Sequence, residues 1–574
     1  MKPVRIRRRE STLEAEAALA DLPPLLRRIY AARGIRSSAE LSRALDILAP
    51  PTQLKGMDVA VQLLYESLVK QQHILVVADY DADGATSCAL MVKALRQMGA
   101  SRVEYLVPNR FEFGYGLTPE IVALAAEKSP DLIITVDNGI ASVAGVERAK
   151  EYGIPVLITD HHLPPTRLPD AAAIVNPNQY GDSFPSKCLA GVGVAFYLLM
   201  ALRLHLREAN WFVTQGIDEP NLAQHLDLVA LGTVADLVPL DQCNRALVHQ
   251  GLRRIAADKA CHGVRALLLV AGKSSHNIQA SDLGFGLGPR LNAAGRLDDM
   301  TVGIECLLAN SPEAAFTLAS QLDNLNRSRR EIEARMQLEA LALVDEIATT
   351  ELPTGICLMQ PGWHVGVVGI VASRLKERCA RPVIVFSLEG EDTLKGSGRA
   401  ITGFHMRDAL ANIDAKYPDL ILKFGGHAMA AGLTIRAQDF EQFAEVFDVE
   451  AAACLSAEQL EQIIESDGVL ETEQLDLAHA ELLQQAGPWG QRFPEPCFDG
   501  QFHVEDYLVV GEKHVKMRLR SRPDAPSLNA IWFSAVDLLP ARLDRIHIAY
   551  RLSVNEYLAT RSVQLIIEHL QPVN

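Results

Sequence analysis

Apolar runs alternate with stretches of helical spacing between about residues 55 and 240. Five runs predict strands: Ile74–Val77, Val103–Val107, Leu132–Val136, Pro155–Thr159 and Ala172–Val175. The intervening segments, such as Pro119–Glu127 and Val143–Tyr152, space their apolar residues as a helix does. Continuously apolar strands separated by helices are typical of a parallel sheet covered on both faces. We therefore predict an α/β domain whose ligands bind at the carboxyl ends of the strands.

A second α/β pattern follows a long helical one. Ser311 and Pro312 predict a helix start, and neither proline nor glycine interrupts the pattern before about Ile347. A helix of this length more often connects two domains than lies in one core. Beyond it, a strand, a helix and another strand are predicted at Ile356–Met359, Val365–Arg378 and Pro382–Phe386.

The two ends of the chain differ from these α/β parts. Residues 1 to about 45 predict an arginine-rich helical extension that ends near Pro50 and Pro51. Residues 490–574 have short alternating strands, as in a small β-barrel of the OB type. The predicted domains are thus a helical extension (1–50), a parallel-sheet domain (51–310), a connecting helix (311–350), a smaller α/β domain (351–450), and a helical segment with the barrel (451–574).

Three aspartates at alternate positions follow the first predicted strand. Asp79, Asp81 and Asp83 would repel one another at the end of a buried strand, and one or two divalent cations between them would remove that repulsion. A solvated turn is the plainer interpretation. An EF-hand is excluded because its twelfth position, which requires Glu, is Leu90.

Candidate ligands recur in corresponding places along the chain. Asp137 follows Leu132–Val136, Asp160-His161-His162 follows the strand ending at Thr159, and Asp236 ends the apolar run from Leu231. Any one of these aspartates could simply cap a helix. Four such places together favour metal binding, and carboxylates with one imidazole suit Mn²⁺ or Mg²⁺ better than structural zinc. Two such ions about 4 Å apart can drive an in-line phosphoryl displacement.

Composition limits the class of protein. The 574 residues are 48% hydrophobic and 22% charged, as in a globular protein of two to four domains, and no apolar stretch is long enough to span a bilayer. The basic N-terminus lacks the apolar core of a signal peptide, and the nine cysteines include no CxxC pair, so a cytoplasmic location is expected. A net charge of −16 argues mildly against a generic nucleic-acid binder, but it allows a local basic groove.

A basic strand in the predicted barrel supplies such a groove. A strand over residues 513–522 would place four cations on one face: Lys516, Arg518, Arg520 and Arg522. Its other face would turn apolar side chains inward: Val515, Met517 and Leu519. A solvated edge strand is the alternative, but OB-type barrels commonly bind single strands. The nearby His514, Trp532 and Phe533 could stack on bases or belong to the core.

The ordered set of motifs resembles the DHH phosphoesterase superfamily. The resemblance rests on Asp79-x-Asp81-x-Asp83-Gly84, Asp137-Asn138-Gly139, Asp160-His161-His162 and Asp236. The stretches 396–399 (Gly-Ser-Gly-Arg) and 425–432 (Gly-Gly-His-Ala-Met-Ala-Ala-Gly) resemble the accompanying DHHA1 domain. The motifs at 289–296, 487–490 and 493–496 narrow the resemblance to the bacterial single-strand-specific 5′→3′ DNA exonucleases of that superfamily, from about residue 50 to the end.

The resemblance implies roles for individual residues. Two Mn²⁺ or Mg²⁺ ions would be bound by six side chains, of which Asp137 would bridge: Asp79, Asp81, Asp83, Asp137, His161 and Asp236. Asp160 and His162 would support the ligands or touch the scissile phosphate. Further groups would contact phosphate or DNA: Arg110, Arg290, Asn292, Arg296, Ser397, Arg399 and His427. The stretch 396–399 could otherwise be a plain hairpin turn, and Ser397 with Arg399 are our candidates for a 5′-phosphate pocket.

The implied function is a single-stranded-DNA 5′→3′ exonuclease that releases 5′-mononucleotides in recombination and repair. The resemblance further implies single-strand-binding protein and a RecQ-type helicase as partners, and we expect a monomer. A phosphohydrolase for pyrophosphate, cyclic dinucleotides or very short RNA is one alternative, and the basic strand near Arg518 counts against it. A non-enzymatic replication scaffold is another, but such relatives lose metal ligands that this chain keeps.

Overall fold

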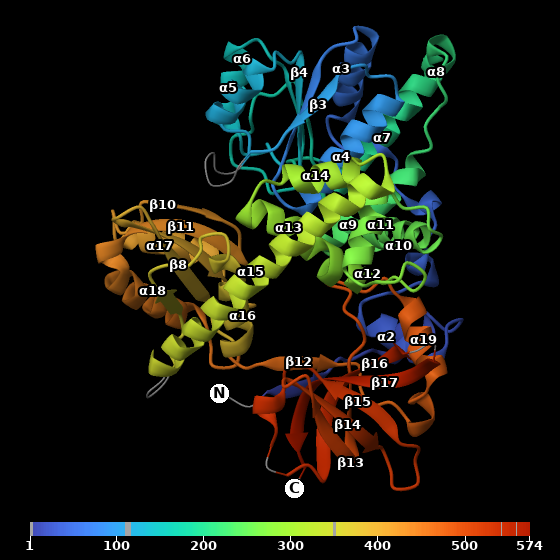
Figure 1. Ribbon diagram of the computed structural model, residues 1–574, viewed down its shortest axis with the longest axis vertical. Coiled ribbons are helices and arrows are strands. Elements are labelled where there is room, and N and C mark those ends of the chain that lie inside the picture. Colours follow the sequence, from blue (N-terminus) through green and yellow to red (C-terminus); the bar gives the residue numbers. More distant parts are fainter. Residues whose placement is uncertain (1–3, 109–115, 348–351, 541, 558–559, 574) are drawn as a thin grey trace. The chain divides into compact units, whose positions relative to one another are not determined.

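The computed structural model describes residues 4–108, 116–347, 352–540, 542–557 and 560–573. The chain divides into two compact units (Figure 1). One consists of Arg8–Asn326 with Ser466–Asn574, and the other of Met1–Arg7 with Arg327–Glu465. Among the helices described, none is both long and apolar enough to cross a lipid bilayer.

A five-stranded parallel sheet organises the first part of the larger unit. Its order is β3-β2-β4-β5-β6, and its strands are β2 (Ile74–Ala78), β3 (Val103–Leu106), β4 (Leu132–Val136), β5 (Val156–Thr159) and β6 (Ala173–Val175). Each lies within one residue of the predicted bounds at either end. The predicted α/β class with a parallel sheet is therefore confirmed.

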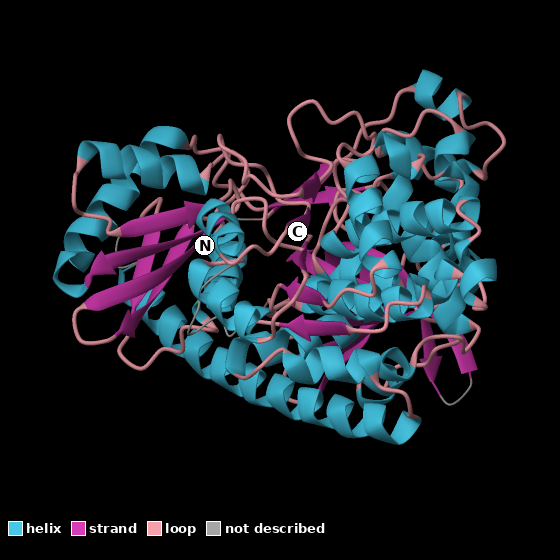
Figure 2. Cartoon of the chain, turned by 90° about the horizontal axis from the view of Figure 1, so that it is seen from above, coloured by secondary structure: helices cyan, strands magenta, loops and turns pink. Residues whose placement is uncertain are grey.

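Helices cover both faces of this sheet (Figures 1 and 2). One face packs against α3 (Met57–Val69), α4 (Ala82–Gln97) and α7 (Gly191–Glu208), and the other against α5 (Pro119–Glu127) and α6 (Val143–Glu151). Alternate residues of β2 enter the two cores, with Val76 on the α4 side and Val77 on the α5 side. Both faces of β2 are thus buried, which explains its continuous apolar sequence.

A helical layer follows the sheet. After α8 (Trp211–Gln215), which packs against α7, the layer comprises α9 (Leu226–Ala235), α10 (Gln242–Ala256), α11 (His262–Val270), α12 (Ala280–Asp282), the π-helical turn η5 (Leu283–Leu287), α13 (Gly288–Leu297) and α14 (Thr301–Leu308). Asp236 is the C-terminal cap of α9. The prediction that Asp236 corresponds to the other strand-end aspartates is therefore wrong, because a short buried apolar run does not distinguish a strand from a helix.

The predicted long helix is α15 (Pro312–Ile347). A mixed sheet of order β10-β11-β9-β8-β7 follows in the smaller unit. Its elements are β7 (Ile356–Met359), α16 (Val368–Cys379), β8 (Val383–Glu389), β9 (Thr393–Arg399), α17 (Met406–Lys416), β10 (Lys423–Gly426), β11 (Ala430–Arg436) and α18 (Phe440–Cys454). The stretch 396–399 lies within β9, so the hairpin-turn interpretation is wrong. A Cβ on Gly396 would lie 2.5 Å from the ring of Phe386, and the glycine therefore serves packing.

A closed barrel of order β13-β14-β15-β17-β16 completes the larger unit. Its strands are β13 (Phe498–Val510), β14 (His514–Arg520), β15 (Leu528–Trp532), β16 (Arg545–Tyr557) and β17 (Thr560–Pro572). Helices α1 (Leu13–Ala17), α2 (Pro24–Ala32) and α19 (Leu477–Ala486) share its core, and so do Leu240 and Val248 beside and within α10. The barrel and the helical layer are thus joined by one hydrophobic core.

The sequence predicted a helical N-terminal extension, but its first described residues form a strand. Arg5–Arg8 forms strand β1, which pairs with β12 (Ile463–Ser466). The arginines serve as anchors. Arg8 lies 2.8 Å from Asp499, and the buried Arg33 lies 2.7 Å from Asp467. These two charges therefore attach the N-terminal segment to other parts of the larger unit.

Candidate metal centre and nucleic-acid interfaces

Three motifs meet at one edge of the parallel sheet. Asp79 follows β2, Asp137 follows β4 and Asp160 follows β5, and these strands are neighbours in the sheet. Because parallel strands present their carboxyl ends at the same edge, residues far apart in sequence become adjacent. All three aspartates are buried. The predicted convergence at the strand ends is therefore present.

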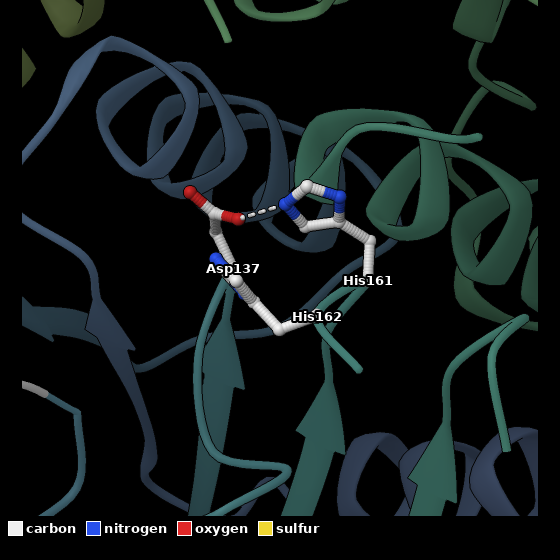
Figure 3. A group of neighbouring side chains, drawn as sticks. All are labelled: Asp137, His161 and His162. Carbon is white, nitrogen blue, oxygen red and sulfur yellow. Dashed lines mark ion pairs between the residues drawn. The ribbon is translucent and has the colours of Figure 1, made fainter. Parts of the chain in front are cut away.

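The six predicted metal ligands fall into two groups. Ligand atoms of Asp79, Asp81 and Asp137 lie within 4.8 Å of one another, as do those of Asp83, His161 and Asp236. A third set with the same spacing contains Asp137, His161 and His162. His161 Nε2 lies 3.1 Å from Asp137 Oδ1 (Figure 3) and 3.5 Å from Asp236 Oδ2. Asp137 and His161 thus link the two groups.

Local hydrogen bonds shape the acidic loop. Asp81 caps α4 and accepts from the amides of Asp83 and Gly84 at 2.9 and 3.0 Å. The carboxylate of Asp83 accepts from the amides of Gly191 and Val192, at 2.6 and 2.9 Å, where α7 begins. The positive end of that helix favours the negative charge. Asp83 is therefore held in place by the backbone of the protein itself.

Two residues that the sequence did not single out give room to the centre. A Cβ on Gly191 would lie 2.5 Å from Asp137 Oδ1, so only glycine allows α7 to begin this close to Asp137. A Cβ on Gly295 would lie 1.9 Å from the carbonyl oxygen of Tyr80. Both contacts depend on the tertiary fold, so the sequence alone does not predict them. The one sequence signal for Gly191 was its position as a glycine at the start of an otherwise apolar helix.

Helix α13 supports the acidic loop from outside. The side-chain oxygen of Asn292 accepts from the amide of Ala82 at 2.8 Å, which makes Asn292 a positioning group for α4. Arg290 is buried and donates to Asp323 at 2.9 Å and to the carbonyl of Gly286 at 2.6 Å. This placement argues against the predicted phosphate contact by Arg290. Arg296 is half-buried in the last turn of α13, and its phosphate contact stays a prediction.

The buried carboxylates of the centre repel one another, and bound cations would remove that repulsion. Burial, followed by repulsion from neighbouring carboxylates, raises the pKa of Asp79, Asp137 and Asp236 well above the ordinary value. The same causes raise the pKa of Asp83 to about 7. Divalent cations reverse this cost, because carboxylates then gain attraction where they had repulsion. Oxygen donors with one imidazole fit Mn²⁺ or Mg²⁺.

Asp160 has a different task from the ligand aspartates. Its Oδ1 accepts from the amide of His161 and from Nδ1 of His162, both at 2.7 Å, and its Oδ2 accepts from the amide of Ile140 at 2.9 Å. Burial alone raises the pKa of Asp160, but these bonds and the two imidazoles outweigh burial and lower it to about 2. Burial lowers the pKa of His162, yet Asp160 and the other carboxylates raise it to about 9. Asp160 therefore positions the two histidines.

The groups of a candidate anion site lie close together in the smaller unit. In β9, Arg399 donates to the hydroxyl of Ser397 at 3.0 Å. A Cβ on Gly369, in the first turn of α16, would lie 2.8 Å from Arg399 and 2.9 Å from Ser397. A hydroxyl and a guanidinium thus meet a helix N-terminus, an arrangement that suits phosphate. His427 is exposed just after β10, and Arg110 lies outside the described residues.

The barrel presents a basic and aromatic surface. Along β14, Lys516 and Arg518 are exposed and Val515, Met517 and Leu519 are buried, as predicted. A groove of about 500 Å³ includes Lys516, Arg518 and the exposed rings of Tyr507 and Phe533. His514 packs edge-on against Phe533 at 5.3 Å between ring centroids, whereas Trp532 belongs to the core. Phe533 is therefore a surface ring, and Trp532 is a core ring.

Two of the four predicted cations on β14 are engaged elsewhere. Arg520 forms an ion pair with Glu505 and donates to the carbonyl of Ala525 at 3.0 Å. Arg522 lies beyond the end of β14 and pairs with Glu473 at 3.3 Å. The prediction that Arg522 shares the strand face is therefore wrong, because β14 ends at Arg520 and the chain turns.

Comparisons with known proteins agree with this geometry. Family models match in order: the N-terminal domain of the DHH family at residues 73–233, the DHHA1 domain at 347–453 and the RecJ OB domain at 466–569. The single-stranded-DNA-specific exonuclease RecJ of Dickeya dadantii is 55% identical over 571 residues, and that of Escherichia coli is 51% identical over 574 residues. Each alignment covers 99% of both chains.

Solved structures extend the comparison to metals. RecJ from Thermus thermophilus in complex with Mn²⁺ is 31% identical, with a TM-score of 0.81 over 100% of this chain and 80% of that one. The same protein in complex with Mg²⁺ gives 29% and 0.75, over 100% and 79%. The resemblance found in the sequence is confirmed at the level of the whole chain. This chain belongs to the RecJ family of single-stranded-DNA-specific exonucleases.

Proposed function

We propose that this chain is a metal-dependent exonuclease that hydrolyses single-stranded DNA from the 5′ end and releases 5′-mononucleotides. The observation that best supports this proposal is the pair of ligand groups linked by Asp137 and His161, in a chain from a family of single-stranded-DNA-specific exonucleases. The class of enzyme follows from the family. The polarity and the roles of individual residues are our proposals.

We assign the two ligand groups to two divalent cations, Mn²⁺ or Mg²⁺. Asp79 and Asp81 would hold one cation, Asp83, His161 and Asp236 the other, and Asp137 both. Relatives were solved in complex with Mn²⁺ and with Mg²⁺. Such ions, when bound, supply a nucleophilic water at neutral pH and neutralise charge on the leaving oxygen.

The protein's own groups would orient the substrate. Asp160 accepts from Nδ1 of His162 and so sets the plane of that imidazole beside the ligands. His162 would then donate from Nε2 to an oxygen of the scissile phosphate. This orientation requires no movement of Asp160, because backbone amides on both sides already fix that carboxylate.

Polarity would come from the anion site of the smaller unit. Ser397, Arg399 and the first turn of α16 offer a hydroxyl, a guanidinium and backbone amides to a terminal 5′-phosphate, with His427 as a wall. The choice of single strands would come from the barrel. Tyr507 and Phe533 offer faces for unpaired bases, and Lys516 and Arg518 offer charge to the backbone.

The cellular role is proposed from the family resemblance. The chain would act in DNA recombination and repair, in the cytoplasm, beside single-strand-binding protein and a RecQ-type helicase. We propose that it works as a monomer. Sedimentation of the purified chain would check the last point directly.

Digestion of end-labelled strands tests the function. In Mn²⁺ or Mg²⁺, a 5′-labelled single strand should lose its label at once as a mononucleotide, while a 3′-labelled strand shortens gradually. Duplex DNA and samples with EDTA should stay intact. Initial release of label from the 3′ end would overturn the polarity, and equal digestion of duplex would overturn the single-strand preference.

A matched pair of variants ties the activity to the centre. D137A should abolish digestion. D170N changes an aspartate that is 85% exposed on the same domain and ion-paired with Lys150, so it should keep native activity. Loss of activity in both variants, or in neither, would separate the reaction from the proposed centre.

A further inference from the structure

An aromatic side chain is held in solvent by a rare backbone turn. Phe285 is 79% exposed at the middle of the π-helical turn η5, between α12 and α13. The backbone of the turn packs against α9, since a Cβ on Gly284 would lie 3.2 Å from the side chain of Val234. π-Helical turns are rare and are frequently found at functional sites. The ring of Phe285 is thus presented on a supported backbone.

A second apolar side chain is exposed beside the metal centre. Leu237 directly follows the candidate ligand Asp236 and is 68% exposed. Its φ of 60° lies in the left-handed region, which side chains without a local hydrogen bond rarely adopt. The fold therefore maintains backbone strain at a position where a leucine faces water.

Leu237 and Phe285 line the same pocket. It has a volume of about 670 Å³ and lies between the helical layer and the barrel, which share one core. Val234, Val238 and Leu552 contribute apolar surface to it. A pocket of this size accepts planar rings the size of a nucleobase.

The charges around the pocket are balanced. Its three cationic side chains form ion pairs: Lys273 with Asp282 at 2.7 Å, Arg551 with Glu495 at 2.7 Å and Arg561 with Glu481 at 3.0 Å. In the barrel groove, by contrast, Lys516 and Arg518 are exposed. A pocket whose cations are paired and whose lining is in part apolar favours an uncharged planar ligand over a phosphate.

We infer that Leu237 and Phe285 form a stacking platform for bases of the single strand next to the scissile phosphate. The inference rests on the proposed function and adds a binding site between the metal centre and the barrel. Stacking on an apolar face tolerates every base, so the platform would hold the strand without sequence preference. A paired base could not enter, and the platform would therefore add to the preference for single strands.

Variants combined with abasic strands test the platform. F285A should raise the KM for a single-stranded oligonucleotide by about 5- to 150-fold, the range expected for loss of one stacked base, with kcat little changed. F285W should restore the native KM. L269A, which removes an equally apolar side chain that is 65% exposed in α11 and does not line the pocket, should behave as the native chain.

The abasic strands identify the partner of the ring. A series of strands, each with one abasic residue at a different position near the 5′ end, should show one position that weakens binding to the native chain but not to F285A. Equal KM values for F285A and the native chain, or additive losses at every position, would overturn the inference.

Failure of the platform and failure of the enzyme are distinguishable. Fluorescence anisotropy of a labelled single strand in EDTA reports binding without hydrolysis, so the same comparison of F285A with L269A applies even if no digestion occurs. Weaker binding by F285A alone supports the platform. Equal binding by both variants contradicts it, whatever the activity.

Discussion

Nε2 of His161 lies 3.1 Å from Oδ1 of Asp137, although the two residues follow different strands. This contact joins two groups of oxygen donors into one centre. Burial and mutual repulsion raise the pKa of Asp137 far above its ordinary value, so the carboxylate is costly unless cations accompany it. The arrangement of these donors thus suits metal ions.

Replacing His161 should weaken one cation more than the other. H161A removes a donor from the group with Asp83 and Asp236 but leaves Asp79 and Asp81 intact. We expect activity to fall by at least about 100-fold, since even groups that only support a ligand cost 10- to 100-fold. Calorimetric titration with Mn²⁺ should show one weakened site. Two sites of native affinity would contradict the assignment of His161.

Replacing Asp160 should affect orientation rather than metal binding. D160N keeps the shape but loses the charge that holds His161 and His162. We expect kcat to fall by about 10- to 100-fold, as for other groups that orient ligands, while KM changes little. Titration with Mn²⁺ should still detect two ions. Complete loss of metal binding would instead make Asp160 a ligand.

The sequence predicted the centre to the extent that it depends on strand ends. Asp79, Asp137 and Asp160 each follow an apolar run, and parallel strands bring such positions together. Asp236 ends a helix, which periodicity over a short run cannot distinguish from a strand. The roles of Gly191 and Asn292 depend on approaches between distant segments. No local pattern records those approaches.

The same limit applies to the basic surfaces. Alternation along β14 correctly placed Lys516 and Arg518 outside, because it depends only on the strand. The position of Arg522 depended on where the strand ends, and the ion pair of Arg290 with Asp323 depended on the packing of α13 against α15. Partners that come from other elements could not be predicted from spacing.

Breaking the ion pair of Arg290 should cost stability. Arg290 and Asp323 are both largely buried and 2.8 Å apart. R290M would remove one charged partner from a largely buried carboxylate, at a cost of about 1.5–3 kcal/mol in the free energy of unfolding. Urea unfolding should measure that loss. A stable R290M with weakened DNA binding would instead restore the phosphate contact that the sequence suggested.

Asp499 should make part of the stability depend on acid pH. Burial alone raises the pKa of Asp499, but hydrogen bonds from Arg8, Ser466 and His547 outweigh it and lower the pKa to about 2. The folded pKa lies below the unfolded value of about 3.9, so the contribution is complete above pH 4 and is lost as the pH falls toward 2. Unfolding from pH 6 to pH 2.5 should therefore show the difference between native chain and D499N shrinking below pH 4. A constant difference would contradict the assignment.

The salt dependence of DNA binding should show whether the exposed cations of the barrel contact phosphates. If Lys516 and Arg518 contact phosphates, each displaces counterions from the strand, and each adds about 0.7 to the slope of log binding constant against log salt. The double variant K516A/R518A should thus lower the slope by about 1.4 in anisotropy titrations with a labelled single strand. R522A is the matched control, because Arg522 lies past the end of β14 and pairs with Glu473. An equal change in R522A would mean that general charge, and not this strand face, attracts the DNA.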